Sequence, residues 1–220
     1  MMRNVKSRFV LYVLLIFHSF IVTALIAEQQ APYELGVDYQ KIVKPLQVAT
    51  NIEQLDQLES VSHIELFYWI GCESCYQVEA ELILYLNQHP EYTFRRTPLV
   101  ARVEWRQQAY LQAIIQQIPD QTMGLDVLDL YRQCLTDCEA FTKVESSIEW
   151  LLKGTDLDSR PQIDYEKLWQ QQKKYQKRAD LFSITQVPTI IINETYQVNG
   201  SQAQSAKRML QIIDYLLTLE

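Results

Sequence analysis

The sequence predicts a mixed α/β fold in which an all-helical lobe is inserted between the two halves of a small sheet domain. Three observations lead to this prediction. Residues 63–70 have the pattern of a buried strand, residues 103–180 show helical patterning with no strand signal, and strand patterns return after residue 187. The chain has 220 residues, of which 48% are hydrophobic. It is therefore long enough to bury a core as one domain with an insertion.

The first half of the chain is predicted to contain a βαβ unit. An extended lead-in with a short edge strand at 33–39 comes first. Residues 63–70 are β-branched, aromatic and apolar with little alternation, as in a strand buried on both faces. Residues 73–88 carry apolar side chains at helical spacing and stop before a proline, and residues 92–100 alternate like a strand.

The end of the chain is predicted to form a ββα unit. Strand patterns cover 188–192 and 196–198, and Asn193-Glu194 between them is a hairpin turn signal. The last helix is predicted at about 202–219.

A βαβ unit followed by a ββα unit is the thioredoxin arrangement. We therefore predict a thioredoxin-like domain from residues 28–102 and 181–220, with residues 103–180 as an inserted helical lobe. Breaks within the lobe are expected at five positions, namely Pro119, Gly124, Asp137, Gly154 and Pro161.

The first 27 residues have the layout of an export signal. Arg3, Lys6 and Arg8 precede an apolar run over 9–27. Polar residues interrupt this run, which favours a cleaved signal peptide over 1–27 against an uncleaved membrane anchor. Either form exports the body, as a soluble protein of the bacterial periplasm or anchored to the inner membrane and facing that compartment. The cysteines are therefore expected in an oxidising environment.

The charge and composition exclude several function classes. The formal net charge is −7, and removing the three basic residues of the first 27 positions makes it −10. A body this acidic repels phosphate backbones, so we expect no nucleic-acid partner. The composition is unlike that of a disordered, collagen-like or multi-span membrane chain, and four cysteines are too few for a disulfide scaffold.

Cys72 and Cys75 lie where the predicted strand 63–70 ends and the next helix begins. Two cysteines three residues apart on a first helical turn are close enough to form a disulfide. A helix N-terminus favours an anion, so we expect a lowered pKa for the Cys72 thiol, which makes Cys72 the nucleophile and the more buried Cys75 the resolving residue. An inert disulfide, or a zinc site shared with Cys134 and Cys138, remains as an alternative, although the pairs are much farther apart than in compact zinc ribbons.

Pro188 opens the strand predicted at 188–192. This placement is unusual because proline cannot donate a hydrogen bond to a strand ladder. A cis bond between Val187 and Pro188 would put the backbone of Val187 against the dithiol and offer a substrate peptide an edge for pairing. A trans proline that only begins the strand is the alternative, and the nearby Cys72 unit favours the cis form.

Two segments resemble those of a known family. Residues 65–76 (ELFYWIGCESCY) resemble the active-site segment of the DsbA family of periplasmic thiol:disulfide oxidoreductases, and residues 187–193 (VPTIIIN) resemble its cis-proline strand. Trp105 with the following helical segment up to 128–131 (LDLY) is similar to its inserted lobe, and residues 33–45 resemble its lead-in. The resemblance covers nearly all of the chain after residue 27.

This resemblance implies a thioredoxin fold with a helical insertion and a catalytic pair of Cys72, the attacking cysteine, and Cys75, its partner. It also implies that Pro188 is in cis and that Val187 contacts the substrate. No metal or organic cofactor is implied. The expected partners are cysteine-containing exported proteins and a quinone-linked membrane oxidase that reoxidises the pair.

The chain departs from the family between the two cysteines. The usual Pro-His dipeptide is replaced by Glu73-Ser74. Ser74 can donate one hydrogen bond but carries no charge, and the charge of Glu73 should raise the pKa of the Cys72 thiol. A less stabilised reduced form makes a weaker oxidant, so the couple is predicted near the middle of the dithiol proteins.

Glu65 is similar to a buried glutamate that lies beneath the dithiol in this family and helps to move protons. One extra position separates Glu65 from Cys72, and a shift of one residue turns a strand side chain to the other face unless a bulge restores the register. Because a bulge could restore the register, Glu65 is kept as a predicted proton relay.

Cys134 and Cys138 lie four residues apart in the helical lobe. A disulfide at this spacing is strained on one continuous helix, but Asp137 indicates that the helix ends nearby. We expect a local structural disulfide, because two free thiols are unusual in an exported protein. A second redox-active pair is the alternative.

The sequence thus predicts an exported, monomeric dithiol oxidase that introduces disulfides into secreted proteins. One alternative is a disulfide reductase or isomerase of weaker oxidising power, although no N-terminal dimerisation domain of an isomerase is visible. Another is a thioredoxin-fold chaperone or adaptor in which the Cys72–Cys75 bond is only structural. An enzyme dedicated to one client would be a narrower form of the first reading.

Overall fold

The computed structural model describes residues 32–43, 63–117, 127–153 and 162–219. Residues 35–220 make one compact unit, and residues 1–34, of which the last three are described, make another. The predicted signal segment and the breaks expected at Pro119, Gly124, Gly154 and Pro161 lie outside the described residues. Within the described ranges, no helix is both long and apolar enough to span a membrane.

A five-stranded sheet forms the centre of the larger unit. Its order is β1-β5-β4-β2-β3, where β2 and β3 are parallel and the other neighbours are antiparallel. In chain order the strands are β1 (Gln40–Lys41), β2 (Ile64–Tyr68), β3 (Phe94–Pro98), β4 (Thr189–Ile192) and β5 (Tyr196–Asn199). All residues of β2 and β4 are buried, as expected for strands covered on both faces.

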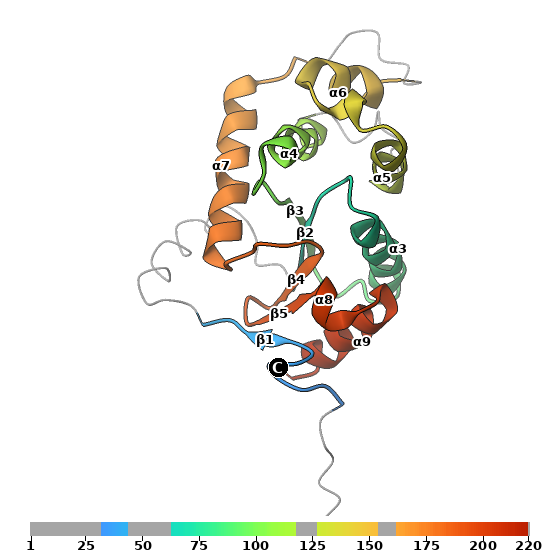
Figure 1. Ribbon diagram of the computed structural model, residues 1–220, viewed down its shortest axis with the longest axis vertical. Helices are drawn as coiled ribbons and strands as arrows, with labels where there is room; N and C mark the ends of the chain where they lie inside the picture. Colours follow the sequence, from blue (N-terminus) through green and yellow to red (C-terminus); the bar gives the residue numbers. More distant parts are fainter. Residues whose placement is uncertain (1–31, 44–62, 118–126, 154–161, 220) are drawn as a thin grey trace, which may run out of the picture. The chain divides into compact units, whose positions relative to one another are not determined.

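Helices cover both faces of this sheet. On one side lie α3 (Glu73–Gln88) and α9 (Ala206–Leu217), and on the other lies α7 (Tyr165–Leu181) (Figure 1). Phe67 of β2 packs with Ala179 and Phe182 in the cluster on the α7 side. This arrangement confirms the predicted α/β class, a thioredoxin fold with a helical insertion.

The insertion is helical in all its described parts. It contains α4 (Val103–Ile115), α5 (Val127–Thr136), the short 3-10 helix η2 (Glu139–Phe141) and α6 (Val144–Leu151) before α7. Figure 1 shows α4, α5 and α6 gathered beyond one end of the strands, with α7 returning alongside the sheet. Asp164 caps α7 by accepting a hydrogen bond from the backbone N–H of Lys167. The division into a domain and a lobe stays a prediction.

Two boundaries differ from the prediction. The edge strand expected at 33–39 is wrong: that segment turns at Gly36, which has a φ of 87°, and the strand is Gln40–Lys41. The last helix is interrupted because Gln204 adopts the left-handed conformation and Ser205 then caps α9, so that α8 (Gly200–Ala203) is separate.

The predicted hairpin turn between β4 and β5 has the conformation that such turns require. Both Asn193 and Glu194 have positive φ, at 46° and 53°. Two central residues with positive φ match the right-handed twist of the strands that they join.

Candidate active site

The first turn of α3 carries a disulfide between Cys72 and Cys75, whose Cα atoms lie 5.2 Å apart. Cys72 is the N-cap residue, and its Sγ accepts a hydrogen bond from the backbone N–H of Cys75 at 3.1 Å. The hydroxyl of Ser74 lies 3.3 Å from the same sulfur. These donors, with the helix N-terminus, would stabilise a thiolate on Cys72 after reduction.

The two sulfurs differ in accessibility. Cys72 is partly exposed, whereas Cys75 is 0% exposed. An external thiolate can therefore approach Cys72 and not Cys75. Glu73 between them is exposed, so its charge is screened by solvent.

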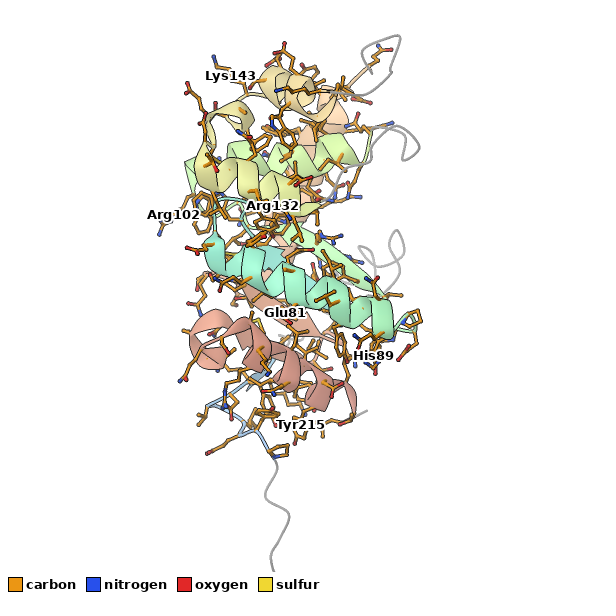
Figure 2. All side chains as sticks on the ribbon, turned by 90° about the vertical axis from the view of Figure 1, so that its right-hand side faces the viewer. Glu81, His89, Arg102, Arg132, Lys143 and Tyr215 are labelled. Carbon is orange, nitrogen blue, oxygen red and sulfur yellow. A yellow bond between two sulfur atoms is a disulfide. The ribbon has the colours of Figure 1, made fainter. Side chains whose placement is uncertain are left out.

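The loop before Cys72 is packed through aromatic rings. The carbonyl oxygen of Trp69 accepts a hydrogen bond from the Cys72 N–H at 3.1 Å. A side chain at Gly71 would lie 2.5 Å from the Trp69 ring, so the close approach of this ring requires glycine. Trp69 stacks on Trp105 at 5.1 Å, and the guanidinium of Arg102 lies over Trp105. Figure 2 shows Arg102 beside the N-terminal end of α3.

A second loop reaches the end of the sheet at which β2 leads into the Cys72 loop. The bond between Val187 and Pro188 is cis. Because Thr189 pairs with Phe67, Pro188 lies across from the end of β2, which leads directly into the Cys72 loop. The backbone N–H of Gly200 donates to the Pro188 carbonyl oxygen at 2.9 Å. The topology thus places the cis proline and the dithiol at one end of the sheet.

Comparison with known proteins finds relatives that match most of the chain. The chain is 26% identical over 200 residues to the thiol:disulfide interchange protein DsbA of Azotobacter vinelandii, covering 88% of each chain. It is 24% identical over 204 residues to the protein of that name from Pseudomonas aeruginosa, covering 88% of this chain and 89% of the relative. No family model matches the chain.

Solved structures share the fold. The crystal structure of Pseudomonas aeruginosa DsbA has a TM-score of 0.63 at 20% identity and covers 84% of this chain and 93% of its own. The oxidoreductase NmDsbA1 from Neisseria meningitidis has a TM-score of 0.60 at 16% identity, with coverage of 84% and 94%. The chain is thus similar to DsbA proteins over most of its length, in sequence and in its thioredoxin-like fold. This similarity supports a protein thiol:disulfide oxidoreductase, as the sequence predicted.

Glu65 is 1% exposed and lies in an ion pair on the α7 side of the sheet. Its carboxylate accepts hydrogen bonds from the Arg178 guanidinium and, at 2.5 Å, from the Thr97 hydroxyl. Phe67, two residues along β2, shares this side, whereas α3 with its cysteines covers the other (Figure 1). These contacts hold the Glu65 carboxylate in the structure, and its role in proton transfer stays a prediction.

Glu79 is a buried carboxyl that the sequence pattern did not single out. It lies one helical turn after Cys75 on the buried side of α3 and is 0% exposed. Arg96 of β3 donates to its carboxylate at 2.6 Å, and the Tyr131 hydroxyl lies 3.4 Å away. Burial raises the pKa of Glu79, and Arg96 opposes that shift. The four-residue spacing from Cys75 was the signal that could have identified it.

Cys134 and Cys138 form the second disulfide. The helix α5 ends at Thr136, between the two cysteines, so the pair does not lie on one continuous helix. The four cysteines are thus paired locally in two disulfides rather than gathered around one point. Among the described residues, no group of three or more His, Cys, Asp or Glu side chains could hold a metal ion.

Proposed function

We propose that this chain is an exported dithiol oxidase that introduces disulfides into secreted proteins through Cys72 and Cys75. The observation that carries the proposal is the asymmetry of the pair: one sulfur is accessible and hydrogen-bonded at a helix N-terminus, and the other is buried. Such a disulfide is open to attack at Cys72, with the buried sulfur as leaving group.

The reaction proceeds by two exchanges at sulfur. A substrate thiolate attacks Cys72 Sγ, the bond between Cys72 and Cys75 breaks, and its electron pair goes to Cys75, which takes up a proton. A second substrate thiolate then attacks the substrate sulfur of the mixed disulfide, and Cys72 leaves as a thiolate. The substrate loses two electrons and gains a disulfide, and the Cys72/Cys75 pair is reduced.

The cis-proline loop supplies the peptide-binding part of the proposal. Val187 precedes the cis bond and lies at the same end of the sheet as the dithiol. We infer that backbone groups of Val187 pair with an extended substrate segment next to Cys72. Pro188 has no N–H to donate, so pairing at this point would use the backbone groups of Val187.

The compartment and partners follow from the same proposal. The basic and apolar segment over 1–27 is typical of export, here to the bacterial periplasm. The substrates are cysteine-containing exported proteins, and a quinone-linked membrane oxidase would restore the disulfide. The protein would act as a monomer.

Glu73-Ser74 favours a second candidate, a reductase of the same fold. The negative charge of Glu73 destabilises a thiolate on the neighbouring Cys72, and Ser74 offers only one neutral hydrogen-bond donor to it. Equilibration with glutathione decides between the two. A potential of roughly −120 to −180 mV supports the oxidase, and about −270 mV supports the reductase.

The decisive experiment compares Cys72→Ser with Cys75→Ser in the oxidised full-length protein and a peptide with one cysteine. In the Cys75→Ser variant, with Cys72 held as a mixed disulfide with glutathione, the peptide thiolate should attack Cys72 Sγ, form a disulfide with Cys72 and release glutathione as a thiolate. The Cys72→Ser variant should form no adduct because Cys75 is buried. Equal adducts in both variants, or none in either, would show that Cys72 is not the sulfur that exchanges with the substrate. A chaperone or adaptor with a merely structural disulfide would keep its binding to partner proteins in Cys72→Ser.

A further inference from the structure

One side-chain amide, that of Gln108 in α4, joins the two disulfide regions. Gln108 is 8% exposed and uses both ends of its amide. Its Nε2 donates to Cys138 Sγ at 3.0 Å, and its Oε1 accepts a hydrogen bond from the indole N–H of Trp69. Only this orientation of the amide satisfies both neighbours, because an indole N–H cannot be an acceptor.

The Trp69 end of this connection leads to the attacking cysteine. The carbonyl oxygen of Trp69 accepts the hydrogen bond of the Cys72 N–H, and the ring covers Gly71 and stacks on Trp105. The position of Trp69 therefore fixes the backbone conformation of the residues that lead into Cys72, the N-cap of α3.

The Cys138 end depends on the second disulfide. Cys138 lies beyond the end of α5, and its bond to the buried Cys134 ties this loop to the helix. Local hydrogen bonds complete the loop: Glu139 N–H donates to Asp137 Oδ1 at 2.9 Å, and Phe141 N–H donates to the Cys138 carbonyl oxygen at 3.1 Å. A neutral sulfur is a weak acceptor, so this contact serves to locate Gln108 rather than to bind it strongly.

We propose that Gln108 is a positioning residue through which the Cys134–Cys138 disulfide sets the redox equilibrium of Cys72 and Cys75. The inference rests on the proposed function, since it concerns the same dithiol. The oxidised pair is held by its own covalent bond. After reduction, a Cys72 thiolate would depend on the hydrogen bond that the Cys75 N–H donates to Cys72 Sγ, which is already aligned in the oxidised form. Loss of the two hydrogen bonds of Gln108 should therefore destabilise the reduced pair more than the oxidised pair.

The test measures equilibrium with glutathione for the wild type, Gln108→Leu and the double variant Cys134→Ser/Cys138→Ser. Each change should lower the equilibrium constant for oxidation of glutathione by about threefold or more, which is about 14 mV for a two-electron couple. The triple variant should match either change alone, because all of them break one connection. Gln116→Leu, an exposed position at the end of the same helix, should leave the constant unchanged.

Two results would overturn the inference. One is an equilibrium constant within about 1.5-fold of wild type in both Gln108→Leu and the serine double variant, with thermal unfolding still cooperative. The other is an additive effect in the triple variant, which would mean two independent perturbations. A purely structural role of Gln108 would lower the unfolding temperature and leave the constant unmoved.

The proposed function can fail separately. If the wild-type Cys72–Cys75 pair does not exchange with glutathione, that function is refuted. The inference is then decided by the rate at which iodoacetamide modifies Cys72 after selective reduction of the first pair. A rate that falls about threefold or more in both variants upholds the positioning role, and an unchanged rate refutes it.

Discussion

The Glu65–Arg178 ion pair should be a major determinant of stability, and Arg178→Met tests it. The two side chains are 1% and 8% exposed and lie 113 residues apart in the sequence. Without the guanidinium, the buried carboxylate of Glu65 keeps only the hydroxyl of Thr97, at 2.5 Å, among the contacts described above. Leaving one charge of a buried pair uncompensated costs about 3–5 kcal/mol, so we expect a loss of that size.

Two further variants separate the free energy of the ion pair itself from the contributions of its neighbours. Glu65→Leu should cost about 1–3 kcal/mol, because Arg178 retains Glu194 at 3.3 Å. The double variant Glu65→Leu/Arg178→Met should lie within about 2 kcal/mol of wild type, since an apolar replacement of both partners leaves no unpaired charge. The two single changes are therefore expected to be strongly non-additive.

Guanidinium unfolding of the oxidised protein at pH 7 measures these differences. Arg132→Met is the control, because Arg132 and Asp129 form an exposed pair with 52% exposure on both sides and should contribute less than about 1 kcal/mol. A loss below about 1 kcal/mol in Arg178→Met, or additivity in the double variant, would refute the reasoning. Unchanged peptide oxidation by the double variant would also remove Glu65 as a proton relay.

Three further predictions concern the active-site region. Glu73→Gln should raise the reduction potential by about 10–30 mV in glutathione buffers, because a charge worth about 0.5–1.4 kcal/mol no longer opposes the Cys72 thiolate; a lower potential would contradict this. Burial raises the pKa of Glu79, so the folded state holds this proton to higher pH than the unfolded state. The free energy of unfolding should then fall as pH rises above about 4.3, by at most about 1.4 kcal/mol per pH unit, and Glu79→Gln should remove that slope in unfolding curves from pH 4.5 to 7. Gly200→Ala would place a Cβ 3.2 Å from two ring carbons of Pro188. It should cost about 1–2 kcal/mol and slow exchange with a cysteine peptide but not with glutathione, and an equal effect on both thiols would count against a peptide-binding role of this loop.

Local chemistry along the chain was enough to predict most of the fold and the position of the dithiol. The apolar run over 63–70 indicated a strand buried on both faces, and β2 is buried throughout. The helix predicted over 73–88 is α3, with the same bounds. These predictions succeed because side-chain periodicity and the helix N-terminal position of Cys72 depend on neighbours within a few residues.

The edge strand and the last helix show where local patterns stop being sufficient. Gln40–Lys41 is a strand because it pairs with β5, more than 150 residues later, and not because of its own propensity. The last helix breaks because Ser205 provides a second cap, a choice that apolar spacing does not reveal.

The partners of the buried polar groups were decided by tertiary structure alone. Periodicity can place Glu65 on a strand and Gln108 on a helix, but it cannot say that the first meets Arg178 or that the second lies between Trp69 and Cys138. Those contacts depend on how helices of the lobe pack on the sheet. A buried polar group must find a partner within hydrogen-bonding distance, and that distance is set only when elements far apart in the sequence come together.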